Sequence, residues 1–157
     1  MRRADREVKE RSEILRIMKD CDDVILAFND DVSPYILAVN FGVREEDEVI
    51  TMYFHGAIEG KKYDYLHDGA VASFQMSTNH KLIMDKERGY CTMNYESIIG
   101  HGEVYEVSEY SEKEDALEVL VQKYHLPSEK FVYARAAIPR TRVFKLCVKK
   151  LTCKAKA

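Results

Sequence analysis

The sequence contains no apolar run that approaches the roughly 20 residues a helix needs to cross a lipid bilayer. Its first residues, Met1 to Arg6, are mostly charged, so the apolar segment of a secretory signal is missing as well. These two absences argue against a membrane span and against export. We therefore expect a cytoplasmic protein that has no membrane partner.

The sequence also lacks a basic region. Its 24 lysines and arginines are outnumbered by 27 aspartates and glutamates, which gives a net charge of −3 at pH 7. A protein that binds the nucleic-acid backbone needs a positive face, so we expect no nucleic-acid partner. The one cluster of lysines fits a solvated tail and consists of Lys149, Lys150, Lys154 and Lys156.

Cysteines are few and have no paired spacing. The chain contains neither a C-x-x-C pair nor a cysteine–histidine cluster at the spacing of a zinc site. His67, His80 and His125 likewise have no partner at metal-ligand spacing. The sequence therefore predicts reduced thiols, no structural disulfide and no metal site. The cysteines are Cys21, Cys91, Cys147 and Cys153.

Nothing in the sequence marks a boundary between domains. The three prolines are widely spaced, and no internal repeat or low-complexity linker is present. At 157 residues the chain has a usual length for one domain with one hydrophobic core. We expect a single domain over residues 1–157.

Two segments have the periodicity of amphipathic helices. The first covers residues 11–20, where apolar residues recur between charged ones, and the second covers residues 112–124. The apolar positions of the first helix are Ile14, Leu15, Ile17 and Met18. The expected buried face of the second helix consists of Ala116, Leu117, Leu120 and Val121.

Most other segments have the pattern of antiparallel strands. Residues 23–28 and 35–43 are joined by a stretch rich in turn formers, residues 29–34, and are typical of a hairpin. An acidic turn over residues 44–48 leads to a third strand, residues 49–54, which favours a meander. Further strands are expected over residues 70–76, 90–107 and 142–151.

Shorter segments complete the predicted fold. A short helix is expected over residues 58–66, and a further helix could form over residues 128–137. The polar residues 77–81 are typical of a strand end or a turn. Six or so antiparallel strands with interspersed helices predict a mainly β fold, a small barrel with helical decoration.

The stretch from Tyr53 to Lys62 has the composition of a phosphate-binding turn. A β run meets small residues and then opens a helix that bears Lys61 and Lys62. Small residues let the backbone approach an anion, N–H groups at a helix start favour negative charge, and lysines add positive charge. The alternative is an ordinary strand–helix turn whose lysines face solvent.

Several motifs extend this indication over nearly the whole chain. The most specific are Tyr53-Phe54-His55-x-Ala57-x-Glu59-Gly60-Lys61-Lys62 and Tyr95-x-Ser97-Ile98-Ile99-Gly100-x-Gly102. The others are Met1-Arg2-Arg3-x-Asp5-Arg6-Glu7-Val8, Pro34-Tyr35-Ile36, Asn40-Phe41-Gly42 and Arg142-Val143-Phe144-Lys145-Leu146. With these motifs, in this order, the chain resembles the pyridoxamine 5′-phosphate oxidase-like flavoproteins, specifically their nitroimidazole-resistance branch.

The resemblance implies an antiparallel split β-barrel that binds FMN and works as a homodimer, with two flavin sites at the subunit interface. By this analogy Gly60, Lys61 and Lys62 bind the FMN phosphate, and Gln75 lies near the isoalloxazine. The implied cofactor-binding residues are Val39, Asn40, Phe41, Phe54, His55, Gly56, Ala57, Gly60, Lys61, Lys62, Gln75, Tyr95, Ser97 and Ile98, of which the last three approach the cofactor from the partner chain.

His55 is the candidate catalytic residue, because it matches a histidine that this branch places beside the flavin. Reduction of a nitro group consumes protons, and an imidazole with a pKa near neutrality can supply them. The alternative is a histidine that packs at the barrel rim and bonds to backbone.

Two positions near the implied cofactor depart from the pattern of the branch. Gly56 stands where many relatives carry serine, so the loop lacks a hydroxyl. Glu96 stands where the branch usually has arginine. A carboxylate near a phosphate is unfavourable unless it points away or pairs with a lysine.

The function implied is that of an FMN-dependent oxidoreductase that reduces a small organic acceptor, with nitroimidazole reduction as one member of the class. Basic residues that would hold a second phosphate are not evident near the C-terminus, which argues against pyridoxamine phosphate as the substrate. The alternative is a non-enzymatic barrel that binds flavin or haem, with His55 or His101 as the haem ligand. A deazaflavin cofactor is a third alternative.

Overall fold

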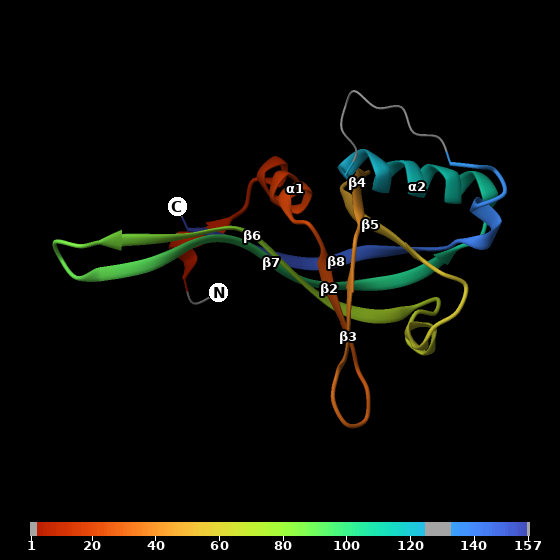
Figure 1. Cartoon of the computed structure of the whole chain (residues 1–157), viewed down its shortest axis with the longest axis horizontal. Helices are drawn as coiled ribbons and strands as arrows, with labels where there is room; N and C mark the ends of the chain where they lie inside the picture. The colour runs from red at the N-terminus through yellow and green to blue at the C-terminus, as the bar shows by residue number, and fades with distance from the viewer. Residues whose placement is uncertain (1–2, 125–132, 157) are drawn as a thin grey trace.

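The structure is a computed structural model, and it describes residues 3–124 and 133–156. Within this part of the chain, eight strands form one sheet, with two α-helices and three short 3₁₀ helices between them (Figure 1). The strands are β1 (Glu7–Val8), β2 (Val24–Phe28), β3 (Tyr35–Val39), β4 (Gly42–Glu46), β5 (Val49–Gly56), β6 (Ala70–Asp85), β7 (Tyr90–Val107) and β8 (Arg142–Lys156). The helices are η1 (Ala4–Arg6), α1 (Arg11–Asp20), η2 (Lys61–Asp64), α2 (Tyr110–Tyr124) and η3 (Ile138–Arg140).

The order of the strands explains why the sheet closes into a barrel. The order is β3-β2-β6-β7-β8-β5-β4, with β1 paired to β8, and every pairing is antiparallel. The strands at the two ends, β3 and β4, are joined by only Asn40 and Phe41, which together span about 11 Å at most. The sheet must therefore curl until its ends meet. Because β3 and β4 are not neighbours in this order, the barrel is split at that point, as expected.

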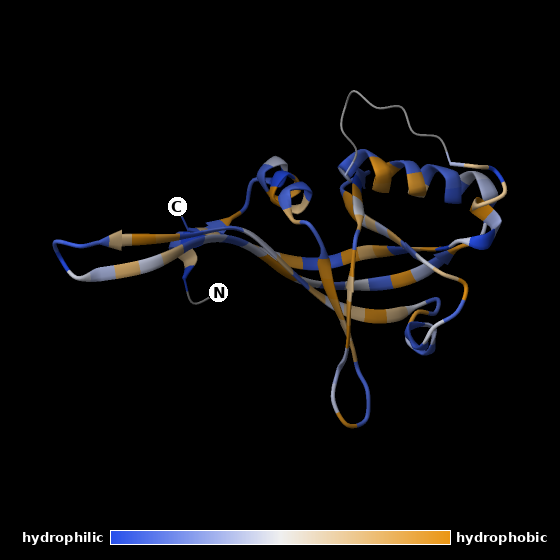
Figure 2. Cartoon of the chain, viewed as in Figure 1, coloured by the Kyte–Doolittle hydropathy of each residue, from blue (hydrophilic) through white to orange (hydrophobic). Residues whose placement is uncertain are grey.

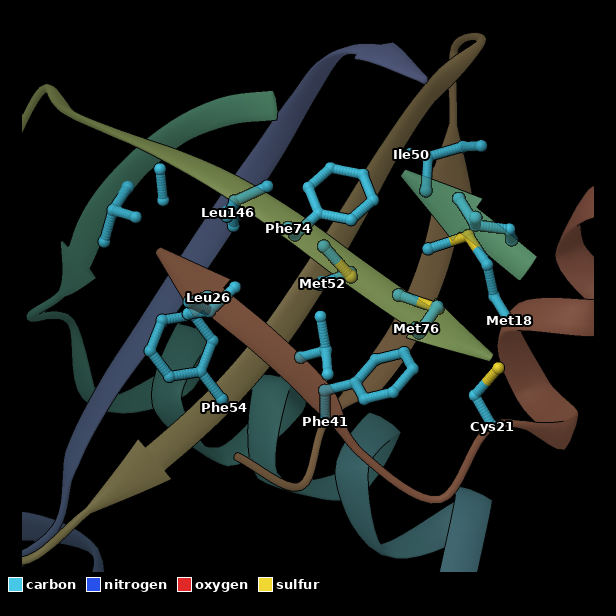
Figure 3. Packing of buried hydrophobic residues seen from close by; sticks show 14 of the residues in the cluster. Met18, Cys21, Leu26, Phe41, Ile50, Met52, Phe54, Phe74, Met76 and Leu146 are labelled. Carbon is cyan, nitrogen blue, oxygen red and sulfur yellow. The ribbon is translucent and has the colours of Figure 1, made fainter. Parts of the chain in front are cut away.

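Alternating side chains of the strands fill the barrel. In β5 every second residue is buried, which places Phe54 inside and His55 outside. The same alternation holds in β2 and in the first half of β6. Figure 3 shows these side chains meeting under α1, which contributes Met18. The largest fully buried side chains include Phe41, Phe54, Phe74, Phe144, Leu26, Met52, Met76 and Ile98.

Helix α2 covers the outer side of β4 and β5 and belongs to a second, smaller cluster with Val107, Ile138 and Val143. The prediction of both helices is confirmed, α1 over its full length and α2 with two additional residues at its start. The predicted buried face of α2 is wrong at one position, because Val119 is buried where Val121 was expected and Val121 is only half-buried. No helix in the described residues is long and apolar enough to span a membrane.

The single strand predicted over residues 35–43 is wrong. The chain forms β3 and β4 on opposite ends of the sheet, and only β3 completes the predicted hairpin with β2. The break occurs where Phe41 turns inward and is fully buried. The acidic turn is also shorter than predicted, because only Asp47 and Glu48 have positive φ angles, 48° and 64°, while the three preceding residues belong to β4.

Strand β6 does not end at Met76 as predicted. It continues through the polar residues 77–81 to Asp85, with an irregularity in its pairing between Thr78 and Lys81, where Asn79 has a φ of 55°. The long β7 supplies the partner that keeps these polar residues extended. Strand β8 similarly extends beyond the predicted end, to Lys156.

Two predicted helices differ from the structure. The segment 58–66 forms only the four-residue η2, because Gly60, with a φ of 148°, interrupts the helical path. The first half of the helix considered over residues 128–137 lies outside the described residues, and 133–137 contain a turn that leads into η3.

Close packing of Gly42 against α2 generates a testable prediction. A Cβ atom at this position would lie 2.7 Å from the Leu120 Cα and N atoms and from the Val119 carbonyl carbon, and backbone cannot move aside cheaply. Gly42→Ala should lower the free energy of unfolding by about 1–3 kcal/mol, measured by urea denaturation. Gly56→Ala is the matched control, because its Cβ would meet only side-chain ends of Lys62 and Tyr63. Equal losses in both variants would contradict this account.

Candidate functional site

The predicted phosphate-binding stretch leaves the barrel at the end of β5. Phe54 points inward and its ring stacks on Phe144 at a centroid distance of 5.7 Å. His55, one residue on, is exposed on the outer side, and Gly56 ends the strand opposite Arg142. The strand alternation thus presents the His55 side chain to solvent, whereas Phe54 can contribute only its backbone there.

Tyr63 holds the shape of the loop between Gly56 and Lys62. Its hydroxyl donates a hydrogen bond to the Ala57 carbonyl, and its backbone N–H donates to the Gly60 carbonyl at 3.1 Å. The Arg142 guanidinium lies 4.0 Å from the centre of the Tyr63 ring. Two hydrogen bonds to Glu106, of 2.7 and 2.5 Å, fix that guanidinium. The loop is therefore clamped to β7 and β8.

The two lysines of the loop form no close ion pair in the described residues, although the charge of Lys61 helps to lower the pKa of Asp30. The Lys62 Nζ atom lies beside Gly56, only 2.2 Å from where a Cβ would stand, and the Lys61 Nζ atom lies 5.9 Å from the centre of the Tyr35 ring. Neither ammonium forms an ion pair with any carboxylate of the described residues. Two unpaired cations beside a glycine-bearing turn suit a phosphate group.

His55 lies close enough to this loop for the charge of Lys62 to act on its imidazole. Desolvation by the surrounding chain, and secondarily the positive charge of Lys62, lower the pKa of His55 below its usual value. The ring remains exposed on the outer side of β5. Both effects favour the neutral imidazole over the imidazolium in the free protein.

The segment Val39–Phe41 passes next to His55. The β4–β5 ladder ends at the pair of Gly42 with Tyr53, so Asn40 lies two residues before the ladder and His55 two residues after it. The Asn40 side-chain amide donates to the Asp22 carbonyl at 3.3 Å. Phe41 faces the core, where the Lys123 Nζ atom lies 3.3 Å from its ring centre. Because its ring is buried, Phe41 can offer only backbone atoms to a ligand at this end of β5.

Gln75 occupies the outer face of the sheet, half-buried, between Ile25 of β2 and Ile99 of β7. Ile25 in turn pairs with Ala38, next to Val39. Gln75 is thus two strands away from the Val39–Phe41 segment on a shared surface.

The remaining predicted residues lie elsewhere in the chain. Ile98 is fully buried, and Tyr95 and Ser97 are half-buried near the other end of β7. Nine residues of strand separate Ser97 from Glu106, the residue that clamps the loop through Arg142, which amounts to roughly 30 Å. A single chain does not bring Tyr95 and Ser97 to the loop.

The carboxylate of Glu96 is neutralised within the chain. The Arg16 guanidinium of α1 donates to one Glu96 oxygen at 2.5 Å, and the Asn79 amide donates to the other at 2.6 Å. Glu96 therefore ties α1 to the pairing irregularity in β6, and the charge reversal at this position is compensated by an arginine instead of a lysine.

Sequence reasoning missed an aromatic pair beside the loop. The rings of Tyr35 and Tyr65 stack at 4.2 Å with an angle of 4°, and the Tyr65 hydroxyl donates to the Asp30 carboxylate at 2.7 Å. This hydrogen bond lowers the pKa of Asp30 and raises that of Tyr65 to about 12. The Tyr63–Arg142 clamp was missed as well. Neither has a local sequence signal, because the partners are far apart in the chain.

The larger hollows do not coincide with the loop. One of about 380 Å³ lies between α1, β4 and α2 and includes Lys123, whose pKa burial lowers to about 8. A second, of about 330 Å³, adjoins His101 and Lys150 on the outer face of the sheet. In residues 3–124 and 133–156, no cluster of histidine, cysteine or carboxylate side chains could hold a metal.

Comparisons with known proteins agree with this fold. The sequence profile described as pyridoxamine 5′-phosphate oxidase matches residues 10–155. A solved structure of a candidate 5-nitroimidazole antibiotic resistance protein from Bacteroides thetaiotaomicron is 26% identical, with a TM-score of 0.78 over 94% of this chain and 85% of that one. A search among proteins with curated descriptions found no match.

Two further solved structures share the fold at lower identity. An FAD and haem binding protein from Mycobacterium smegmatis is 17% identical, with a TM-score of 0.79 over 96% of this chain and 73% of that one. A flavocytochrome from Azotobacter vinelandii is 19% identical, with a TM-score of 0.77 over 100% of this chain and 72% of that one.

The position of Lys62 predicts a change in the titration of His55. Lys62→Met should raise the pKa of His55, because removal of the neighbouring positive charge favours the imidazolium. Lys61→Met is the matched control and should leave the pKa unchanged, since Lys61 does not contribute to the shift. The measurement is an NMR titration of the histidine ring protons in the cofactor-free protein. A pKa that is the same in both variants would show that Lys62 does not act on His55.

Proposed function

The chain belongs to the pyridoxamine 5′-phosphate oxidase family, and from this premise we propose that it is an FMN-dependent oxidoreductase that reduces a small organic acceptor as a homodimer. The observation that carries the proposal is the clamped loop with the unpaired ammonium groups of Lys61 and Lys62. A phosphomonoester carries up to two negative charges near neutral pH, so two adjacent cations match it.

The residues present fit the phosphate end of FMN. Gly60 adopts a φ of 148°, which favours glycine and leaves the backbone open to a ligand. In the described residues, the N–H groups of Lys61 and Lys62 donate to no protein acceptor. Gly56 has no hydroxyl that could bind the phosphate. The Lys62 ammonium occupies the space that a side chain at position 56 would fill. Binding therefore depends on the backbone and the two lysines.

The flavin ring would lie between His55 and Asn40 on one side and the Gln75 surface on the other. When bound and reduced, flavin supplies hydride to an acceptor. The exposed imidazole of His55 is free to hold a proton for that acceptor. An anionic cofactor beside His55 would raise its pKa, opposing the effect of Lys62.

The separation of the predicted residues supports a homodimer. Ser97 lies roughly 30 Å along β7 from Glu106, the residue that clamps the loop through Arg142, so Tyr95 and Ser97 would serve the partner's site. The outer face of the sheet also carries uncovered apolar side chains suited to an interface. These are Ile25, Ile36, Val71 and Ile99.

The comparisons support a flavin and a planar acceptor to different degrees. The Bacteroides thetaiotaomicron protein is described by 5-nitroimidazole resistance, which favours a nitro-aromatic compound as one acceptor. The Mycobacterium smegmatis protein is described as binding FAD and haem, at an identity that shows the fold alone. FMN is proposed because only one phosphate site is evident in the loop.

The second candidate function is a carrier that binds flavin or haem without turnover. The hollow beside His101 favours this carrier function, because haem needs a slot and an axial ligand. The side chain of His101 is exposed on β7 and could serve as that ligand. The absorption spectrum of the purified protein separates the cofactors, with two flavin bands in the blue and near ultraviolet or one intense haem band. A protein that holds FMN but never reduces an acceptor would be a carrier.

Removal of the two lysine charges tests the phosphate site. Lys61→Ala with Lys62→Ala should weaken FMN binding by a few kcal/mol, on the order of a hundredfold or more in the dissociation constant, because charge-assisted hydrogen bonds are lost. Fluorescence titration with FMN measures the constant. Lys86→Ala with Arg88→Ala removes the same charge at a distant turn and should leave it unchanged. Wild-type affinity in the first variant would defeat the assignment.

Replacement of His55 tests the enzymatic half of the proposal. His55→Ala should retain FMN and lose about 10²-fold or more in the rate at which reduced flavin passes electrons to a nitro-aromatic acceptor. Stopped-flow oxidation of the reduced protein gives this rate over a range of pH. Full turnover in a variant that still binds FMN would mean that His55 is a structural neighbour of the site and supplies no proton.

A further inference from the structure

A lysine occupies the buried side of α2. Figure 2 shows hydrophilic and hydrophobic residues mixed along this helix. Lys123 follows the buried Val119 by four residues, so both side chains lie on the same side of the helix. The Lys123 Nζ atom lies 3.3 Å from the centre of the Phe41 ring, which is fully buried. This position removes part of the water that surrounds an ordinary lysine ammonium.

The nearest partners of the Lys123 amine are uncharged. Its Nζ atom donates one hydrogen bond to the Cys21 carbonyl and another to the Tyr124 hydroxyl, the latter at 3.3 Å. No carboxylate of the described residues forms an ion pair with it. A neutral amine has the two hydrogen atoms that these bonds need. Loss of the third proton therefore leaves both bonds in place and provides a lone pair.

The surroundings of Lys123 favour this neutral amine. Desolvation lowers the pKa of Lys123 to about 8, and the negative charges of Cys21, Asp22 and Asp23 oppose the shift without cancelling it. At pH 7 roughly a tenth of the amine is then neutral, against about a thousandth or less for an ordinary lysine. A desolvated lysine of this kind is a nucleophile toward carbonyl carbon.

The Lys123 amine adjoins the hollow of about 380 Å³ between α1, β4 and α2. This volume is at the lower end of those that bind small molecules. The described lining combines two apolar side chains, one amide and three cationic side chains, and it includes no carboxylate. These residues are Val43, Val119, Gln122, Lys19, Arg44 and Lys123. The lining suits a small ligand that has a short apolar part and a negative charge.

Arg44 is the residue best placed to bind that negative charge. Its Nη1 atom donates to the carboxylates of Glu46 and Asp115 at 3.3 and 3.1 Å. In the part of the chain that the structure describes, its Nη2 and Nε atoms donate to no protein acceptor, and Lys19 forms no ion pair. A guanidinium matches a carboxylate, which is smaller than a phosphate and fits a hollow of this size better.

We propose that the Lys123 amine forms a Schiff base with a short aliphatic aldehyde or ketone that carries a carboxylate and binds in this hollow. The amine nitrogen attacks the carbonyl carbon, and the carbonyl oxygen takes a proton to give a carbinolamine. The hydroxyl then leaves as water while the C=N bond forms, so the two amine hydrogens depart with that water and no oxidant or reductant is needed. A protonated Schiff base keeps a positive charge above the Phe41 ring, which attracts it.

This proposal does not rest on the proposed function, because the hollow does not coincide with the loop after β5. A protein that binds no FMN can still form the Schiff base, and a protein that binds FMN can fail to form it.

The test traps the Schiff base in the wild-type protein at pH 7. Succinic semialdehyde is added with cyanoborohydride, which reduces the C=N bond to a stable amine, and mass spectrometry measures the initial rate at each lysine. Lys86, exposed at the turn between β6 and β7, is the internal reference. Lys123 should react at least about tenfold faster than Lys86, because more of its amine is neutral. A rate at Lys123 no higher than that at Lys86 would overturn the proposal.

Butanal tests the preference for an anion, because it has the same four-carbon chain without the carboxylate. The ratio of the Lys123 rate to the Lys86 rate should be at least about tenfold lower with butanal than with succinic semialdehyde. Equal ratios would show that the hollow does not select a carboxylate, and this class of ligand would be wrong.

A pair of variants assigns the selectivity to the hollow. Lys19→Met with Arg44→Met removes two cations but leaves the Lys123 amine, so the preference for succinic semialdehyde over butanal should disappear. Arg3→Met with Lys9→Met removes the same charge from residues that do not line the hollow, and it should keep the wild-type preference. Equal loss in both variants, or wild-type preference in the first, would contradict the assignment.

Discussion

Burial of the Phe41 ring beneath Lys123 fixes the short passage between β3 and β4, the strands at the two ends of the sheet. With only two residues to span that passage, the sheet has to close. Closure pairs Gly42 with Tyr53 near the end of β5 and leaves Phe54 inside the barrel. Gly42 then meets the backbone of α2 so closely that no side chain fits. The position of the candidate site therefore follows from the way one aromatic ring is buried.

The loop after β5 depends on groups that the barrel brings to it. Its own residues supply the lysines and the glycine, but Tyr63 keeps its place because Arg142 stacks on it, and Arg142 keeps its place because Glu106 binds it. A mobile lysine pair would lose more conformational entropy on binding an anion than a held one. The clamp reduces that loss for the loop as a whole, although the two ammonium groups themselves stay free.

One chain holds only part of the predicted site. Along β7, the residues Tyr95 and Ser97 and the clamp at Glu106 follow one another over 12 residues of a single strand. A rigid strand cannot bring its two ends together.

The sequence by itself determined both helices and most strands, because periodicity is a local property. Small residues beside lysines are local as well, and the phosphate-binding stretch that they indicate stays a prediction. The sequence did not predict the break at Phe41, because residues 35–43 are apolar enough for one strand and only closure of the barrel divides them into two strands. It also missed the continuation of β6 through polar residues 77–81, which depends on pairing with β7. The Tyr63–Arg142 clamp, the Glu96–Arg16 pair and the separation of Ser97 from Lys62 likewise arose from tertiary structure, because each joins residues that only the closed sheet brings together or holds apart.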